Sequence, residues 1–417
     1  IVGPALSFNG TFIAKLRASD GKLIWFKVIN RTCSYSGITL HEGYIYIFMS
    51  ETTLRGLYCK SFILKLRASN GKLIWSTMIE DAFVRDIAAY RGYLYAVGDV
   101  ETQNSRDCYV IKLRTSDGNP QWYKSHGRWV PWMRCFGGDG IEYGYAIAVR
   151  GNAIYLAGST STSSFLADRR ALCNGFFATV GTVPGSSGLL RTISGTVSVS
   201  DIALYGDYIY LAGEIESGCF IAKVDSRNDR VCWFKTFRVE RGFCNNIVPA
   251  GHYVYVTGAW GYPPIYFIAR FYDQNGSLHF IKTLGSPIQT IRSIIAYNNY
   301  LYIAGSTLCS ETVSNAENAY VARMSLEYLS GRNPRSLAWS GSEEWLSVRA
   351  RPSGIQCSDA AVNMRRFTLN PETLNKSFGH FSRHIMISDE TWDVGVHSAY
   401  YPEALLLVST DKASYME

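Results

Sequence analysis

The sequence has 417 residues, of which 47% are hydrophobic, 14% aromatic and 18% charged. This composition excludes an intrinsically disordered chain, because such chains are poor in aromatic residues and rich in charge. The net charge is +7, but the lysines and arginines are spread along the chain rather than clustered, which argues against nucleic-acid binding. No apolar run approaches the roughly 18 residues of a membrane-spanning helix, so we predict no membrane span.

The first part of the chain contains a line that is repeated almost unchanged. "FIAKLRASDGKLIW" at residues 12–25 returns as "FILKLRASNGKLIW" at residues 62–75, fifty residues later. Self-similarity with a period of roughly 20–50 residues indicates one structural unit that is used many times. The line has an alternating strand, a turn rich in Ser, Asp, Asn and Gly, and a second strand with Trp25 or Trp75, which predicts a β-hairpin.

Four more distant copies of this hairpin line begin at residues 109, 220, 267 and 320. Their second strands carry Trp122 in the first copy, Trp233 in the second and Trp339 in the fourth. In the segment that begins at Phe176, the lysine and tryptophan are lost but the hairpin pattern remains.

A second line, usually ending in aromatic-x-Tyr and then Gly, alternates with the hairpin. Its repeated tyrosines are separated by 49, 60, 55, 45 and 47 residues and are Tyr46, Tyr95, Tyr155, Tyr210, Tyr255 and Tyr302. The line adds two apolar strands to each hairpin, and four short strands per unit is the size of a β-propeller blade. We find no sustained 3.6-residue periodicity in these units, which argues against a helical solenoid.

We therefore predict an all-β fold, a β-propeller of four-stranded antiparallel blades, in which residues 1–417 form a single domain. The repeat count favours seven blades, with eight as the alternative, because residues 343–391 are either an insertion or a diverged extra blade. The chain begins in the middle of a unit, and residues 392–410 align with the aromatic-x-Tyr line. We expect this C-terminal segment to close the first blade, since closure removes an exposed sheet edge.

The stretch "FGGDGIEYGYAIAVRGNAIYLAGSTST" at residues 136–162, together with the hairpins, resembles the SBBP-type β-propeller repeats of secreted bacterial and archaeal proteins. The resemblance covers residues 11 to about 342. It implies a propeller in an extracellular or cell-surface setting, and it implies no reaction, because that repeat is a scaffold. "RASDGKLIW" is also similar, more weakly, to the repeat of quinoprotein-like propellers. Those enzymes commonly use adjacent cysteines, which this chain lacks, so we expect no quinone and no other cofactor.

Cysteines and glycosylation sequons both point to secretion. The chain begins at Ile1 rather than Met, so we expect that a signal peptide has been removed. Without any CxxC pair, the cysteines are expected to form disulfides in an oxidising compartment. These ten are Cys33, Cys59, Cys108, Cys135, Cys173, Cys219, Cys232, Cys244, Cys309 and Cys357. Glycosylation is predicted at the sequons Asn9, Asn30, Asn275 and Asn375.

Reactive groups do not gather in any recognisable motif. His380 and His384 have the i, i+4 spacing of metal ligands, but we interpret them as surface histidines because no third ligand is indicated. Asp107, Asp139 and Glu142 lack the spacing of a calcium loop and are interpreted as solvated carboxylates. We predict neither a catalytic residue nor a metal site, and hence no enzyme.

Two aromatic stretches, residues 125–138 and 259–267, interrupt the repeat and are rich in the residue types that anchor interfaces. The partner-binding candidates in them are Trp129, Trp132, Trp260 and Tyr262. Loops that cap the core are the alternative interpretation, because Trp and Tyr also cover propeller faces.

The expected function is that of a secreted, non-catalytic structural propeller, a self-associating subunit of a filament, sheath or surface layer. Its partners would be other copies of itself, through a lattice or a donated terminal segment, or other surface proteins. The alternative is a carbohydrate- or protein-binding adhesin that uses the two aromatic stretches, and the third hypothesis is an extracellular hydrolase or lyase.

Overall fold

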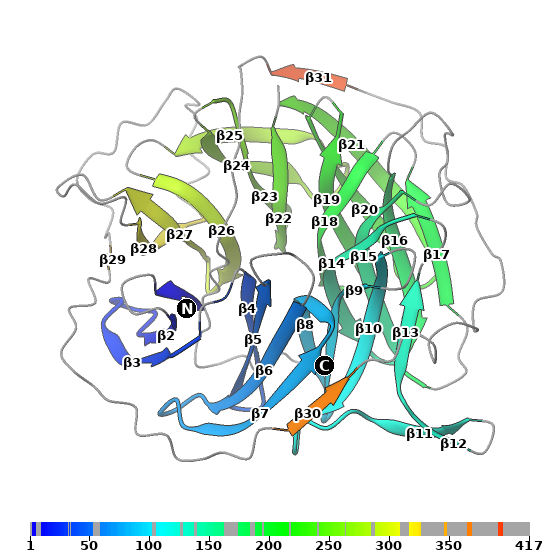
Figure 1. The fold of residues 1–417 in the computed structure, drawn as a ribbon. Helices are drawn as coiled ribbons and strands as arrows, with labels where there is room; N and C mark the ends of the chain where they lie inside the picture. Colours follow the sequence, from blue (N-terminus) through cyan, green and yellow to red (C-terminus); the bar gives the residue numbers. More distant parts are fainter. Residues whose placement is uncertain are drawn as a thin grey trace.

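The computed structural model describes residues 2–5, 10–326, 346–347, 365–368 and 391–394. Residues 32, 34, 53–58, 102–105, 126–127, 137–139, 162–173, 184–187, 194–195, 217, 240–241, 263, 285–287 and 309–316 are excluded from this description. All regular elements of the described residues are β-strands. The sheets stand in a ring around a common axis, and the chain is a β-propeller (Figure 1).

Six sheets form the blades, each with four antiparallel strands. Blade I contains β4 (Tyr35–His41), β5 (Tyr44–Thr52), β6 (Cys59–Arg67) and β7 (Leu73–Glu80). Blade II contains β8 (Ala82–Tyr90), β9 (Tyr93–Glu101), β10 (Arg106–Arg114) and β13 (Met133–Phe136). Blade III contains β14 (Glu142–Arg150), β15 (Ala153–Thr160), β16 (Asn174–Gly181) and β17 (Gly188–Ile193).

The second half of the ring repeats this arrangement. Blade IV contains β18 (Thr196–Tyr205), β19 (Tyr208–Ile215), β20 (Gly218–Asp225) and β21 (Arg230–Val239). Blade V contains β22 (Phe243–Ala250), β23 (Tyr253–Trp260), β24 (Ile265–Tyr272) and β25 (Leu278–Leu284). Blade VI contains β26 (Ile288–Tyr297), β27 (Tyr300–Leu308), β28 (Glu317–Ser325) and β29 (Leu346–Ser347).

A three-stranded sheet, which we call the N-terminal sheet, lies between blade VI and blade I (Figure 1). It contains β1 (Val2–Ala5), β2 (Gly10–Leu16) and β3 (Leu23–Ile29). Phe12 and Leu16 pack against Val321 of blade VI, while Val2 and Ile13 share a core cluster with blade I.

Three short additions lie at the rim of the ring. β30 (Arg365–Thr368) pairs in parallel with β7, and β31 (Thr391–Val394) pairs in parallel with β21. The hairpin of β11 (Trp122–Ser125) and β12 (Arg128–Pro131) follows β10 and precedes β13 along the chain, and it extends outward from the ring (Figure 1).

The core lies between the blades, because a blade in a ring is covered on both faces. Seven consecutive residues of β9 are buried, so this strand is apolar on both faces rather than alternating. Most of the large core clusters join residues of two neighbouring sheets; one contains Phe48 and Trp75 of blade I with Tyr109 of blade II. This packing explains the apolar runs of the aromatic-x-Tyr line.

The tight turns between first and second strands follow the local sequence. Glu42 and Gly43, Arg91 and Gly92, and Asn298 and Asn299 all adopt positive φ. Two successive residues with positive φ define the two-residue turn that matches the twist of a hairpin. Glycine and asparagine tolerate this conformation best, which accounts for their recurrence before the tyrosines.

The predicted all-β propeller is confirmed, as are the antiparallel blades and the hairpins of the repeat. The strand beside β2 is β1, from the N-terminal segment. Of the C-terminal segment that was expected there, residues 392–394 instead pair with β21, and residues 395–410 lie outside the described residues. Most of the predicted insertion at residues 343–391 also lies outside them.

Candidate functional site: the junctions between blades

The repeat lysine and tryptophan bind the main chain of the next blade. Lys65 Nζ donates a hydrogen bond to the carbonyl oxygen of Thr115 at 2.8 Å, and Trp75 Nε1 donates to the same oxygen at 3.0 Å. Thr115 belongs to blade II, where its own N–H is bonded to Gly92. We call this arrangement a clamp, because two side chains of one sheet hold one carbonyl of the next.

The clamp recurs with variations around the ring. Lys15 and Trp25 donate to Ala68 O, Lys112 donates to Thr182 O, and Lys223 and Trp233 donate to Asp273 O. Arginine replaces lysine in blades V and VI, where Arg270 donates to Leu326 O, and Arg323 to Ala18 O and Ser19 O. The last of these clamps joins blade VI to the N-terminal sheet.

Blade III departs from this pattern. Thr179 stands where the other blades carry lysine or arginine, as the degenerate sequence at residues 176–193 predicted. Arg191 instead reaches blade IV, where it donates to Asp229 O at 3.2 Å and forms an ion pair with the Asp229 carboxylate at 3.4 Å. Blades III and IV are thus linked by a different arginine.

The repeated tyrosines surround the clamp cations. Lys65 Nζ lies 3.9 Å from the ring centroid of Tyr44 and 5.5 Å from that of Tyr46. Lys112 and Lys223 have the same relation to the tyrosine pairs of their own blades. Aromatic faces attract a cation that burial has partly dehydrated, and burial lowers the pKa of Lys65. The aromatic-x-Tyr line therefore forms the aromatic half of the clamps of Lys65, Lys112 and Lys223.

In blade II, a different tryptophan from the predicted one occupies this place. Trp122, which the repeat alignment assigned to the fourth strand, is 45% exposed on β11. Trp132, which follows the inserted hairpin, is 1% exposed and packs edge-on against Tyr95 with ring centroids 6.2 Å apart. Tyr210 and Trp233 pack in the same way at 6.4 Å. The insertion moves the fourth strand ten positions along the chain, so the alignment at Trp122 was wrong.

Two partly buried aspartates bridge the innermost strands at two junctions. Asp86 Oδ1 accepts the N–H of Ile87, and its Oδ2 accepts the N–H of Ile147 in blade III at 2.9 Å. Asp201 repeats this geometry between blades IV and V, where its Oδ2 accepts the N–H of Ile247 at 2.7 Å. Both lie next to β-bulges, where register shifts leave strand N–H groups to be satisfied by side chains. Burial raises the pKa of each carboxyl to about 7.

Further charged groups approach these aspartates near the axis, and we call the set the axial cluster: Tyr35, Arg85, Asp86, Asp201 and Arg292. Arg85 forms an ion pair with Asp99 at 2.5 Å. Burial raises the pKa of Tyr35, whose hydroxyl also feels the charges of the other four groups. Tyr35, Asp86 and Asp201 retain partial exposure. The groups of the axial cluster are thus close enough to Tyr35 for their charges to act on its hydroxyl.

Sequence reasoning missed the axial cluster, although a signal was present. Asp86 and Asp201 each precede a repeated tyrosine by nine residues, at Tyr95 and Tyr210. An acidic residue at a fixed repeat position within an apolar strand is a structural signal, because a carboxylate placed between blades needs hydrogen-bond donors.

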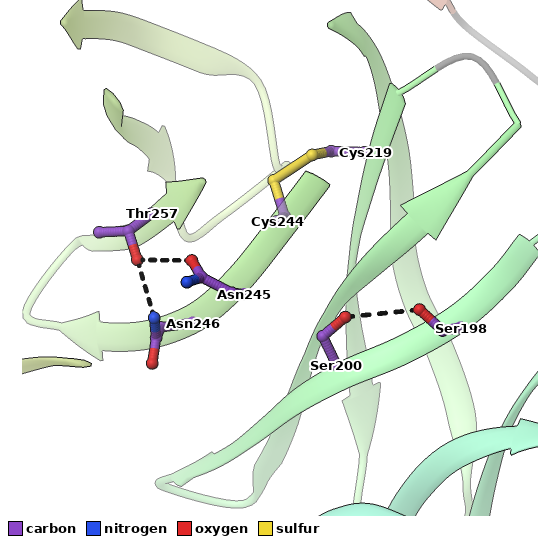
Figure 2. Close-up of a disulfide and its surroundings, with 7 residues drawn as sticks. All are labelled: Ser198, Ser200, Cys219, Cys244, Asn245, Asn246 and Thr257. Carbon is purple, nitrogen blue, oxygen red and sulfur yellow. Dashed lines mark hydrogen bonds between the residues drawn. A yellow bond between two sulfur atoms is a disulfide. The ribbon is translucent and has the colours of Figure 1, made fainter. Parts of the chain in front are cut away.

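One disulfide links blades IV and V. Cys219 on β20 and Cys244 on β22 are bonded, and both residues are fully buried (Figure 2). Beside them, Thr257 Oγ1 donates to Asn245 Oδ1 and accepts from Asn246 Nδ2, as the dashed lines in Figure 2 show. The disulfide itself belongs to the hydrophobic core cluster between blades IV and V.

The prediction that all ten cysteines form disulfides is not supported at four positions. Cys33, Cys108, Cys135 and Cys232 form no disulfide in the structure. At Cys108 the thiol that pairs in the equivalent junction is absent, because Gly144 stands where that junction has Cys244. The side chains of Cys59, Cys173, Cys309 and Cys357 lie outside the described residues.

The partner-binding candidates divide into core and surface residues. Trp132 and Trp260 are buried, and Trp260 stacks on Phe267 at 4.8 Å, so both contribute to the core. Tyr262 is 71% exposed. Trp129 belongs to β12, opposite Lys124 in the projecting hairpin.

Two of the four sequon asparagines are described, and both are exposed. Asn30 follows β3, and Asn275 lies in the turn between β24 and β25. Asn9 and Asn375 lie outside the described residues.

Within the described ranges, no group of three or more His, Cys, Asp and Glu side chains is arranged to hold a metal ion. In the same ranges, we find no helix with the length and apolarity needed to span a membrane.

Comparison with known proteins yields structural similarity alone. No protein-family model matches the chain, and no curated protein matches it. A protein of unknown function from Desulfotomaculum acetoxidans has a TM-score of 0.47 and 12% identity over 78% of this chain and 92% of its own. Hsv2 from Kluyveromyces lactis has a TM-score of 0.43 and 11% identity, over 76% of this chain and 94% of its own.

Quinohemoprotein alcohol dehydrogenase from Comamonas testosteroni is also similar, with a TM-score of 0.38 and 8% identity over 70% of this chain and 61% of the enzyme. At such scores we transfer no function from these proteins to this chain.

Proposed function

We propose that this chain is an extracellular, non-catalytic β-propeller of the cell surface, a self-assembling subunit of a filament, sheath or surface layer. The observation that carries the proposal is the series of clamps between blades. In the clamps, the repeated lysines and arginines and most of the repeated tryptophans bind neighbouring sheets to one another. Such side chains have the structural role expected in a scaffold protein and are not available for catalysis. We also propose that the repeat is of the SBBP type.

We further propose that the N-terminal sheet is the seventh blade. Lys15 and Trp25 form a clamp with blade I in the same way that Lys65 and Trp75 form one with blade II. Arg323 of blade VI donates in turn to Ala18 and Ser19 in the β2–β3 turn. The N-terminal sheet thus donates clamp hydrogen bonds to the sheet that follows it and accepts them from the sheet that precedes it, as a blade does.

An oxidising location is supported by the buried disulfide between Cys219 and Cys244. Disulfides persist mainly in extracellular and other oxidising compartments. Alkylation of protein that is taken from its native cells and then unfolded, with and without prior reduction, tests this point, because both cysteines are buried in the folded chain. We expect two protected cysteines at these positions before reduction, and complete alkylation of both without reduction would contradict the proposal.

Self-assembly is supported by the outer edges of the blades. β7 and β21 each pair with a short strand from the C-terminal quarter of the chain, so an outer edge of this propeller accepts an added strand. β3 presents Leu23 at 51% and Ile24 at 44% exposure, whereas Leu73 and Ile74, in the same sequence context on β7, are partly covered. We propose that a second copy covers this edge by strand addition.

Electron microscopy of protein released without denaturant from its native cells tests the assembly. We expect filaments or sheets whose repeat is one propeller diameter, and we expect the variant Ile24→Lys to remain dispersed because a charge at a strand edge opposes pairing. Isolated rings for both proteins, at all concentrations, would contradict self-assembly.

A binding protein is the second candidate, favoured by the exposure of Tyr262 and by the projecting hairpin that carries Trp129. A glycan array tests it. Saturable binding that Tyr262→Ala and Trp129→Ala reduce, with the fold intact, would support the adhesin over the structural subunit.

A further inference from the structure

Five hairpins carry Asp or Asn at one turn position, and this residue has a structural role in all of them. Its Oδ1 accepts the N–H of the residue two positions later, at 2.9–3.1 Å. This bond forms a side-chain turn that mimics a backbone turn. The residues are Asp20, Asn70, Asp117, Asn228 and Asn275. The presence of an asparagine at this position therefore requires no function beyond the turn.

Asn275 has an additional feature that the turn does not require. Ser277 follows two positions later, and its hydroxyl donates to Asn275 Oδ1 at 2.8 Å. Asn-Gly-Ser is an acceptor sequence for N-linked glycans. Asn275 is exposed at the tip of the β24–β25 hairpin. Asn70 has the same turn geometry, but Lys72 replaces the serine, so the fold contains its own matched control.

An exposed aromatic ring lies beside this turn. Tyr272, three residues before Asn275, is 40% exposed. Its ring packs edge-on against His279, with centroids 4.9 Å apart, and this contact holds the ring beside the hairpin tip. A sugar attached at the tip would cover apolar ring surface that otherwise faces water.

We propose that Asn275 is a site of N-glycosylation and that Tyr272 packs against the first sugar. In the reaction, Asn275 Nδ2 forms a bond to the anomeric carbon of a lipid-diphosphate-linked sugar donor. The bond between that carbon and the phosphate oxygen breaks, the lipid diphosphate leaves with the electron pair, and the amide gives one proton to a base of the transferase. The proposal rests on the extracellular location proposed above.

The test is peptide mass spectrometry of the chain secreted from a host that performs N-glycosylation. We expect a glycan on the peptide that contains Asn275, and its loss in Ser277→Ala, which keeps the asparagine and its turn. Lys72→Ser completes a sequon at Asn70, and we expect this variant to gain a second glycan.

The outcomes separate the site from the location. An unmodified Asn275 in a chain whose Asn70 is modified in Lys72→Ser would overturn the site, and so would a secreted chain with neither position modified. Fractionation of the native cells tests the location independently. Recovery of the protein from the cytoplasm would overturn the extracellular proposal even if the host modified Asn275.

The role of Tyr272 has its own measurement. We expect enzymatic removal of the glycan to lower the melting temperature by about 1–2 °C in the original chain and to leave that of Tyr272→Ser unchanged. Equal shifts in both proteins would overturn the packing of the sugar on Tyr272.

Discussion

The junction between blades II and III and the junction between blades IV and V solve one packing problem in two ways. Both have an aspartate bridge, from Asp86 or Asp201, and a buried cysteine four residues before the clamp lysine. At the IV–V junction, Cys219 is bonded to Cys244. At the II–III junction, Gly144 takes the place of Cys244, and Cys108 keeps its thiol.

This difference shows that the repeat position of Cys108 and Cys219 requires a buried side chain of this size, and that it does not require a disulfide. A Cβ added to Gly144 would lie 2.6 Å from Cys108 Sγ and 2.6 Å from Val97 Cγ2, closer than atoms in contact allow. The thiol of Cys108 thus fills the volume that a second cysteine would need. Burial raises the pKa of this thiol well above its ordinary value, so it remains protonated and unreactive.

The largest expected effect concerns what the two junctions share. Because Asp86 and Asp201 have a pKa of about 7 in the folded protein, each holds a proton between roughly pH 4 and 7 that the unfolded chain has lost. Their contribution to stability is therefore greatest below pH 4 and is lost as the pH rises through 7. From pH 5 to 7, we expect a decrease on the order of 4 kcal/mol for the two together.

Urea unfolding between pH 5 and 8 measures this dependence. Asp86→Asn and Asp201→Asn should each remove about half of the decrease, and blade V already has Asn246 at the equivalent position. An unchanged slope in the double variant would contradict the assignment.

Removal of the disulfide should leave the IV–V junction without a covalent link, as the II–III junction already is. The bond closes a sequence separation of 25 residues, for which loop entropy predicts a loss of about 3 kcal/mol in Cys219→Ala with Cys244→Ala. Chemical unfolding of the oxidised protein measures this loss. Cys232→Ala is the control, because Cys232 is exposed and its thiol is free; an equal loss there would show that the bond is not the cause.

The clamps should also differ between the junctions. Lys223 forms an ion pair with the Asp273 carboxylate at 2.8 Å in addition to its carbonyl bond, whereas Lys112 donates to Thr182 O. We expect Lys223→Met to lower the free energy of unfolding by about 3 kcal/mol and Lys112→Met by about 1.5 kcal/mol. Calorimetry of the two variants compares the two losses. A larger loss for Lys112→Met than for Lys223→Met would contradict the prediction.

The smallest effect sharpens the steric argument at the II–III junction. Gly144→Ala should lower the free energy of unfolding by about 1–2 kcal/mol, because the added methyl group overlaps Cys108. Adding Cys108→Ala removes the overlap, so the double variant should be more stable than the sum of the two single effects. Additive losses in a double-mutant cycle would mean that the two residues do not compete for this space.

The strands, the hairpins and their turns could be predicted because their determinants are local. Alternation and the Asn-Gly and Asp-Gly turns act within about fifteen residues, so each copy of the repeat carries its own instructions. Residues 176–193 kept the pattern and formed the hairpin of β16 and β17, although the lysine and tryptophan were absent.

The candidate site could not be predicted to the same extent, because its partners are distant in sequence. Trp132 looked like a surface anchor until the inserted hairpin placed it against Tyr95. The repeat lysines were recognised as a motif, but their acceptors lie 50 to 70 residues away in the sequence. The acceptor of the arginine that links blade VI to the N-terminal sheet is 305 residues away. A local pattern contains no information about which carbonyl the ring brings within reach.

The sequence by itself determined that this protein is built from repeated antiparallel strands with aromatic, apolar faces, because strand alternation and turn chemistry are properties of neighbouring residues. Only the tertiary structure decided which cysteines meet, that the lysines and tryptophans hold the next blade, and that Asp86 and Asp201 keep their protons near neutral pH. These properties arise from burial and from contacts between sheets, and both exist only after the ring has assembled.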